Sequence, residues 1–338
     1  MRNLKLFFTG GTLSPADKRQ IEAADYELKI GRFDLTEAEL CQSREDIDVY
    51  IVGGFEKVSS HALKLAQKLK VIAYMGIGYE NYVDAKAASA LGIAVTNTPG
   101  GNAQAVAEFT IGLMLEITRK IGYFNTQRRA GKWLEERTIN LRGKKLGLVG
   151  MGAIARIVAK IARRGFEMEV SYYSRQPKTE LHEELGIQYV PFEQLLKESD
   201  LISLHIPCTA ETEGVIGAPQ FEVMKPTAVL INASRARLVD GYALFDALTS
   251  GQIAAAAVDG YYHEPAPQQA DDEFGLLSLP DDKLIVTPHI AYCTEDSMST
   301  MLAMNLNSIA QLLQTGNDQY VVNPDFSRQS RLKVTHLN

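Results

Sequence analysis

The feature that most restricts the fold of this chain is a repeated alternation of short apolar segments with segments of helical periodicity. The first series of strand-length segments is Leu4–Phe8, Val49–Val52, Val71–Tyr74 and Ile93–Thr96, with helix-like Ser60–Leu69 and Ala85–Ala90 between them. The second series is Lys145–Val149, Glu169–Tyr173, Leu201–His205, Ala228–Asn232, Ala255–Asp259 and Leu284–Thr287. Strands that alternate with helices predict parallel sheets covered by helices, so the expected fold class is α/β.

The turn-rich stretch Thr96–Asn102 separates the two series, and 338 residues suffice for two or three domains. A long helix is predicted from Ala103 to Tyr123 and a terminal helix over Glu295–Thr315. If the terminal helix packs on the first domain, that domain is discontinuous. We therefore predict a substrate domain formed by residues 1–99 and 295–338, and a dinucleotide-binding domain over residues 100–294.

Composition excludes several classes of protein. Hydrophobic residues make up 46% and charged residues 22%, which are values of a globular chain and not of a disordered one. The net charge of −6 argues against nucleic-acid binding, which requires a basic surface. Cys41, Cys208 and Cys293 are far apart, so neither a metal cluster nor a disulfide framework is expected. No apolar run is long enough to span a membrane, and a cytoplasmic location is expected.

A glycine motif gives the clearest local indication of function. The strand Leu146–Val149 runs into Gly150-Met151-Gly152-Ala153-Ile154-Ala155, and a helix follows. Gly150 permits the tight turn, Gly152 lets a pyrophosphate approach the backbone, and Ala155 permits close helix–strand packing. The first five residues of the motif are therefore predicted to bind a dinucleotide at the helix N-terminus. A tight turn without a ligand is the alternative, but the position between strand and helix favours the dinucleotide.

The end of the next strand favours NADP over NAD. An acid is expected there to bind the ribose 2′-hydroxyl of NAD, but Ser174-Arg175-Gln176-Pro177-Lys178 follows Tyr173. Arg175 and Lys178 are suited to a 2′-phosphate, with Ser174 beside them. The alternative is that both cations lie on a solvated loop, and NAD is then possible.

Polar residues of catalytic type follow three later strands. Arg235 comes after Ala228–Asn232 and His289 after Leu284–Thr287. Asp259 is the last residue of Ala255–Asp259, and Glu264 follows that strand. In an open parallel sheet, ligands bind beyond the carboxyl ends of the strands. Each of these residues alone has an ordinary structural explanation, but their joint placement predicts an active site.

The chain resembles the D-isomer-specific 2-hydroxyacid dehydrogenase family over essentially its whole length. The matching segments, in order, are MGIGYENYVD, NTPGGNAQAVAE, VGMGAIA, SDLISLHIPCTAETEGVI, INASRARLVDGYAL, AVDGYYHEP and TPHIA. The resemblance implies two Rossmann-like or flavodoxin-like parallel-sheet domains with the active site in the cleft between them. It also implies a homodimer, formed through the long helix after Asn102.

The resemblance assigns roles residue by residue. The catalytic residues would be Arg235, Glu264 and His289, and Ile77 and Gly78 would bind the substrate carboxylate together with Arg235 and His289. Asp259 would meet the nicotinamide amide. The resemblance completes the cofactor pocket with His205, Pro207, Cys208, Thr212, Ala233, Arg235 and His289. The turn from Arg175 to Lys178 is similar to the NADP-selecting turn of glyoxylate/hydroxypyruvate reductases.

The expected reaction is hydride transfer between a nicotinamide and a small 2-keto acid. His289 would donate the proton, Glu264 would orient the ring, and Arg235 would hold the carboxylate. Ala236 stands where the family usually has glycine, so the substrate is less defined than the reaction. Two alternatives remain: a phosphoglycerate dehydrogenase-like enzyme, and a nucleotide-sensing protein like the corepressors that share this fold.

Overall fold

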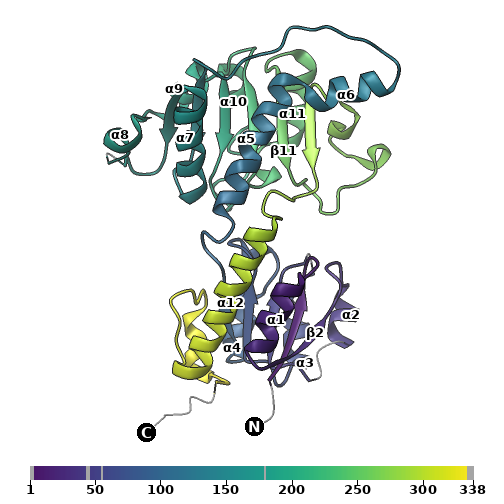
Figure 1. Ribbon diagram of the computed structural model, residues 1–338, viewed down its shortest axis with the longest axis vertical. Helices are drawn as coiled ribbons and strands as arrows, with labels where there is room; N and C mark the ends of the chain where they lie inside the picture. Colours follow the sequence, from purple (N-terminus) through teal and green to yellow (C-terminus); the bar gives the residue numbers. More distant parts are fainter. Residues whose placement is uncertain (1–3, 43–45, 55, 179, 333–338) are drawn as a thin grey trace. The chain divides into compact units, whose positions relative to one another are not determined.

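The computed structural model describes residues 4–42, 46–54, 56–178 and 180–332 (Figure 1). The chain divides into two compact units. The first consists of the chain up to Asn102 together with the chain from Thr294, and the second is Ala103–Cys293. Both units are built on parallel sheets, so the α/β expectation is confirmed.

The first unit contains a five-stranded sheet in the order β2-β1-β3-β4-β5. Its strands are β1 (Leu4–Thr9), β2 (Tyr26–Ile30), β3 (Val49–Val52), β4 (Val71–Tyr74) and β5 (Ala94–Thr96). All four pairings are parallel, with Leu6 opposite Val49 and Val49 opposite Val71. This is the flavodoxin-like strand order. β3 and β4 are buried along their whole length because helices cover both faces of the sheet.

The helices of the first unit are α1 (Pro15–Ala23), α2 (Glu37–Gln42), α3 (Ser60–Leu65), α4 (Ala85–Ala90) and α12 (Glu295–Thr315). The terminal helix α12 packs on β4 and runs beside α1, so the first unit is discontinuous (Figure 1). Thr294 caps it by accepting the Ser297 N–H at 3.1 Å, and Ser299 donates to the Asp17 carboxylate of α1 at 2.7 Å. α3 ends at Leu65, four residues before the predicted Leu69.

The second unit contains a seven-stranded sheet in the order β12-β11-β10-β9-β6-β7-β8. Its strands are β6 (Lys145–Val149), β7 (Glu169–Tyr173), β8 (Gln188–Tyr189), β9 (Leu201–Leu204), β10 (Val229–Asn232), β11 (Ala255–Asp259) and β12 (Leu284–Thr287). The order reverses between β6 and β9, as in doubly wound dinucleotide-binding folds.

Helices cover both faces of this second sheet. They are α5 (Ala103–Arg119), α7 (Ala153–Phe166), α8 (Glu180–Leu185), α9 (Phe192–Glu198), α10 (Ala218–Val223) and α11 (Gly241–Ser250). The helix α6 (Ile121–Arg129), which follows α5, has no buried residue. Leu148 packs into the core beneath α5 and α7, whereas its neighbour Val149 packs into the core beneath α9, α10 and α11. This alternation follows from the two-residue period of a strand. Among the described residues, no helix is long and apolar enough to cross a membrane.

The single helix predicted from Ala103 to Tyr123 is wrong. α5 ends at Arg119, and Lys120 adopts a left-handed conformation with φ of 52° before α6 begins. The Lys120 ammonium lies 3.0 Å from the carboxylates of both Glu136 and Asp282, and these ion pairs hold the break. The apolar spacing on either side is helical, so the sequence pattern does not reveal the change of direction.

Candidate active site

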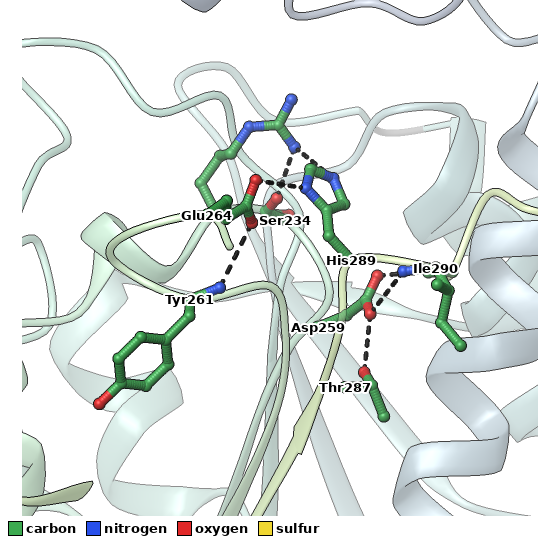
Figure 2. Close-up of polar contacts among 9 residues, drawn as sticks. Ser234, Asp259, Tyr261, Glu264, Thr287, His289 and Ile290 are labelled. Carbon is green, nitrogen blue, oxygen red and sulfur yellow. Dashed lines mark hydrogen bonds and ion pairs between the residues drawn. The ribbon is translucent and has the colours of Figure 1, made fainter. Parts of the chain in front are cut away.

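The three strands with catalytic-type residues at their ends are neighbours in the second sheet. β10, β11 and β12 lie side by side and parallel, so their carboxyl ends meet at one edge. Arg235, Glu264 and His289 come from the loops that follow these strands and meet there. Figure 2 shows Glu264 and His289 facing each other. The structure therefore brings together the residues whose joint placement the sequence predicted.

At this edge a hydrogen bond joins His289 to Glu264. The imidazole Nδ1 lies 2.9 Å from Glu264 Oε2, and the side chains are 16% and 23% exposed. Burial raises the pKa of Glu264, but the hydrogen bond and charge of His289, the Tyr261 N–H and Arg235 outweigh it, so the pKa is lowered overall. The carboxylate therefore stays ionised and can stabilise a cationic imidazole, while Nε2 points away from it (Figure 2).

The guanidinium of Arg235 lies beside Nε2 of the imidazole. Its Nη1 is 3.4 Å from His289 Nε2 and donates to the Ser234 carbonyl at 2.8 Å. Asn232, fully buried at the end of β10, donates to the Arg235 carbonyl at 2.7 Å and accepts the Ser234 N–H at 3.1 Å. Asn232 thus fixes the loop that carries Arg235, a role that the sequence analysis missed.

Asp259 holds the loop of His289. Its Oδ1 accepts from the Thr287 hydroxyl at 2.7 Å and the Ile290 N–H at 2.9 Å, and its Oδ2 accepts the Ala291 N–H at 2.8 Å (Figure 2). The side chain is 2% exposed. His289 itself has a φ of 54°, a conformation that costs a non-glycine residue free energy and persists only where surrounding contacts impose it. Asp259 thus binds two backbone N–H groups and the Thr287 hydroxyl, and these contacts hold His289 in this conformation.

The glycine turn fits the pyrophosphate of a dinucleotide. Gly150 has a φ of 99°, and a Cβ there would lie 2.3 Å from the carbonyl oxygen of His205. Gly152 precedes α7 with no side-chain cap, and a Cβ there would meet no atom within 4 Å. The first N–H groups of α7, from Ala153 and Ile154, therefore face open space in which an anion can be bound.

The residues predicted to bind the 2′-phosphate follow β7 in a turn that is held by hydrogen bonds. The Lys178 ammonium donates to the carbonyl of Met151 in the glycine turn at 2.9 Å, and Ser174 donates to the carbonyl of Gln176 at 2.6 Å. Arg175 is exposed, and its guanidinium makes no hydrogen bond or ion pair with any residue that the structure describes.

The remaining predicted cofactor residues follow β9 and β10. His205 Nε2 lies 2.9 Å from the Ser203 hydroxyl, and burial lowers the pKa of His205 to about 4, so the ring is neutral at pH 7. Thr212 donates to the carbonyl of Pro207 at 2.7 Å and so closes the loop between them. Cys208, in this loop, and Ala233, directly after β10, are both partly buried.

The predicted carboxylate-binding residues, Ile77 and Gly78, belong to the first unit, in the loop after β4. Ile77 is 48% exposed, and its carbonyl accepts from the Asn97 side chain at 3.2 Å.

Sequence reasoning also missed Tyr292, whose ring stands at 87° to that of His289 with 6.1 Å between their centroids. Its position three residues after His289 could have indicated it.

Comparison with known proteins identifies the family of the chain. Residues 111–291 match the model of the D-isomer specific 2-hydroxyacid dehydrogenase family, NAD binding domain. A glyoxylate reductase of Thermococcus litoralis is 39% identical over 80% of this chain and 83% of its own. A D-3-phosphoglycerate dehydrogenase of Archaeoglobus fulgidus is 36% identical over 88% of this chain but only 56% of its own.

A solved structure gives the same result for the fold. The NADPH-dependent glyoxylate/hydroxypyruvate reductase of Sinorhizobium meliloti, in complex with NADP and malonate, matches with a TM-score of 0.77 at 27% identity, over 95% of this chain and 97% of that one. The matching family model, the identity to curated enzymes and the likeness to this structure agree. The chain belongs to the D-isomer specific 2-hydroxyacid dehydrogenase family.

Proposed function

We propose that this oxidoreductase reduces small 2-keto acids to D-2-hydroxy acids with NADPH, and that glyoxylate and hydroxypyruvate are its substrates. The observation that carries the proposal is the imidazole of His289, placed between the Glu264 carboxylate at 2.9 Å and the Arg235 guanidinium at 3.4 Å. Membership of the family makes the enzyme NAD(P)-dependent and its reaction that of 2-hydroxy acids. The choice of keto acid rests on the names of the relatives, glyoxylate reductase and hydroxypyruvate reductase.

The residues of the site divide the chemistry among them. A bound reduced nicotinamide supplies a hydride to the 2-keto carbon, and negative charge grows on the carbonyl oxygen. His289 Nε2 donates its proton to that oxygen, while Glu264, bonded to Nδ1, stabilises the cationic ring. Arg235 binds the substrate carboxylate and adds positive charge beside the same oxygen. In the oxidative direction His289 accepts the hydroxyl proton.

The turn after β7 supports NADPH as the preferred cofactor. The position after β7 has no acid that would repel a 2′-phosphate, and Arg175 and Lys178 supply cations there instead. The relative from Sinorhizobium meliloti was solved with NADP. The glycine turn, Ser174, the loop from His205 to Thr212 and Ala233 are proposed to hold the rest of the dinucleotide, whereas Asp259 is proposed to hold the loop of His289. Ile77 and Gly78 stay predicted contacts of the substrate carboxylate.

A second copy of the chain is the proposed partner. Large apolar side chains are exposed in α6 and in the segment after it: Ile121 at 58%, Trp133 at 86% and Leu134 at 40%. Exposed apolar side chains of this size are typical of interaction surfaces. A molar mass of two chains by light scattering, reduced to one chain in Trp133→Ala, would support a homodimer. A cytoplasmic location stays a prediction from the sequence.

The test of the proposed function follows the absorbance of NADPH and NADH in separate reactions with a panel of 2-keto acids. We expect NADPH oxidation with glyoxylate and hydroxypyruvate, abolished in His289→Ala. The matched control is His263→Ala, because His263 lies beside Glu264 in sequence but is 68% exposed and pairs with Glu273. Oxidation of D-3-phosphoglycerate alone would favour the phosphoglycerate dehydrogenase alternative, and cofactor binding without turnover would favour the nucleotide-sensing one.

A further inference from the structure

The turn that carries Arg175 is closed by the hydroxyl of a buried tyrosine. Tyr172, on β7, is 2% exposed. Its hydroxyl accepts the Lys178 N–H at 2.7 Å and donates to the Lys178 carbonyl at 3.0 Å. A single side chain therefore satisfies both backbone groups of the residue at which the turn ends. The turn begins after Tyr173, the last residue of β7, and Lys178 is bound back to that strand five residues later.

Lys178 also connects this turn to the glycine turn. Its ammonium donates to the carbonyl of Met151, which stands between Gly150 and Gly152. Tyr172 thus holds the backbone of Lys178, and Lys178 holds the two loops together. The ring of Tyr172 is itself fixed edge-on against Tyr189 of β8, with 5.8 Å between the centroids. Arg175, in contrast, is exposed at the tip of the turn, where nothing in the described chain binds its guanidinium.

We infer that Tyr172 is a positioning residue for cofactor selection: its hydroxyl holds the turn in the shape that presents Arg175 and Lys178 to the 2′-phosphate of NADPH. This inference rests on the proposed preference for NADPH. A turn that is ordered before binding costs less conformational entropy when the ligand arrives. The benefit falls on NADPH alone, because NADH has no phosphate for the turn to bind.

The test is Tyr172→Phe, which keeps the ring and removes both hydrogen bonds. A typical hydrogen bond contributes a net amount that corresponds to about a fivefold change in an equilibrium constant. We expect KM for NADPH to rise about fivefold or more, with KM for NADH and kcat unchanged. Tyr173→Phe is the matched control, because Tyr173 is next on the same strand and its hydroxyl makes no hydrogen bond within the described chain.

Two further measurements separate positioning from a general loss of structure. In the Arg175→Ala background, Tyr172→Phe should change KM for NADPH much less, because the two residues act through one interaction. Hydrogen exchange of the Lys178 amide should become faster in Tyr172→Phe, whereas the amides of β6 should keep their protection. This exchange measurement requires no activity.

The outcomes distinguish this inference from the proposed function. If the wild-type enzyme shows no preference for NADPH, the proposed cofactor is wrong and the inference is wrong with it. If the wild type prefers NADPH but Tyr172→Phe keeps the same KM, or raises KM for NADH equally, the inference alone is overturned. The inference is supported by a rise confined to NADPH together with faster exchange at Lys178.

Discussion

Replacement of Asp259 by asparagine tests whether this residue acts through His289 or through the cofactor. The carboxylate accepts three hydrogen bonds from the loop of His289, on both of its oxygens. An asparagine has one acceptor oxygen. If that oxygen keeps Thr287 and Ile290, the amide nitrogen faces the Ala291 N–H, and two donors then oppose each other in a buried place.

The expected size of the effect follows from the bond that is lost. A hydrogen bond to a charged group contributes about 1.5–3 kcal/mol, which corresponds to about 10- to 150-fold in a rate. The φ of 54° at His289 is unfavourable without such bonds, so the loop relaxes and the imidazole loses its alignment with Arg235. We therefore expect Asp259→Asn to lower kcat by about 10- to 150-fold while the Kd for NADPH stays constant.

The assay is steady-state NADPH oxidation, together with titration of NADPH fluorescence to obtain Kd. Asp246→Asn is the control, since Asp246 is an exposed carboxylate on α11 of the same unit. A weaker Kd with unchanged kcat would refute the positioning role and assign Asp259 to the nicotinamide, as the family resemblance implies.

Three further substitutions test the other contacts of the site. In the folded protein the pKa of Glu264 lies below its usual 4.5, so the stability from its pair with His289 is present above pH 4.5 and is lost as the pH falls below that value. Thermal unfolding of Glu264→Gln, followed between pH 3 and 6, should therefore lack this pH-dependent gain in stability. The same pH dependence of unfolding in the variant and the wild type would contradict the pair. Asn232→Ala should raise KM for the keto acid about fivefold, because the Arg235 loop loses two hydrogen bonds; an unchanged KM would argue against this role. Gly150→Ala should abolish cofactor binding measured by fluorescence, since its Cβ would lie 2.3 Å from a carbonyl oxygen; retained binding would show that the turn can shift.

The sequence predicted the strands that carry the site and missed one edge strand of each sheet, β2 and β8. β2 reads YELKI and is largely exposed, and β8 has only two residues, both exposed. Such strands lack the apolar run that marks a buried parallel strand. Central strands such as β9 and β10 are buried throughout and were found. The strands whose carboxyl ends carry Arg235, Glu264 and His289 were all predicted, so missing β2 and β8 did not affect the prediction of the site.

The hydrogen bonds that hold the loops of the site could not be predicted from the sequence, for a different reason. The sequence predicts that Arg235, Glu264 and His289 lie at one edge, because the carboxyl ends of parallel strands share that edge. Whether the Asp259 carboxylate points at a cofactor or at the next loop depends on side-chain direction, which a single sequence does not contain. The same holds for the hydroxyl of Tyr172, since nothing in the letters YYSRQPK distinguishes the tyrosine that bonds the turn from its neighbour.

These supporting contacts have one arrangement in common: a side chain at the end of a strand binds a nearby loop. Asn232 and Asp259 are the last residues of β10 and β11, and Ser203 and Tyr172 are next to last in β9 and β7. Each uses its side chain to bind the loop that follows its own strand or, for Asp259, the loop after the adjacent strand. Loops are the mobile parts of such folds and the strands within the sheet are rigid. Each of these contacts therefore fixes a reacting or binding group relative to the sheet. Substitutions at these four positions should therefore disturb alignment more than folding, since the strands that bear them are held by their neighbours on both sides.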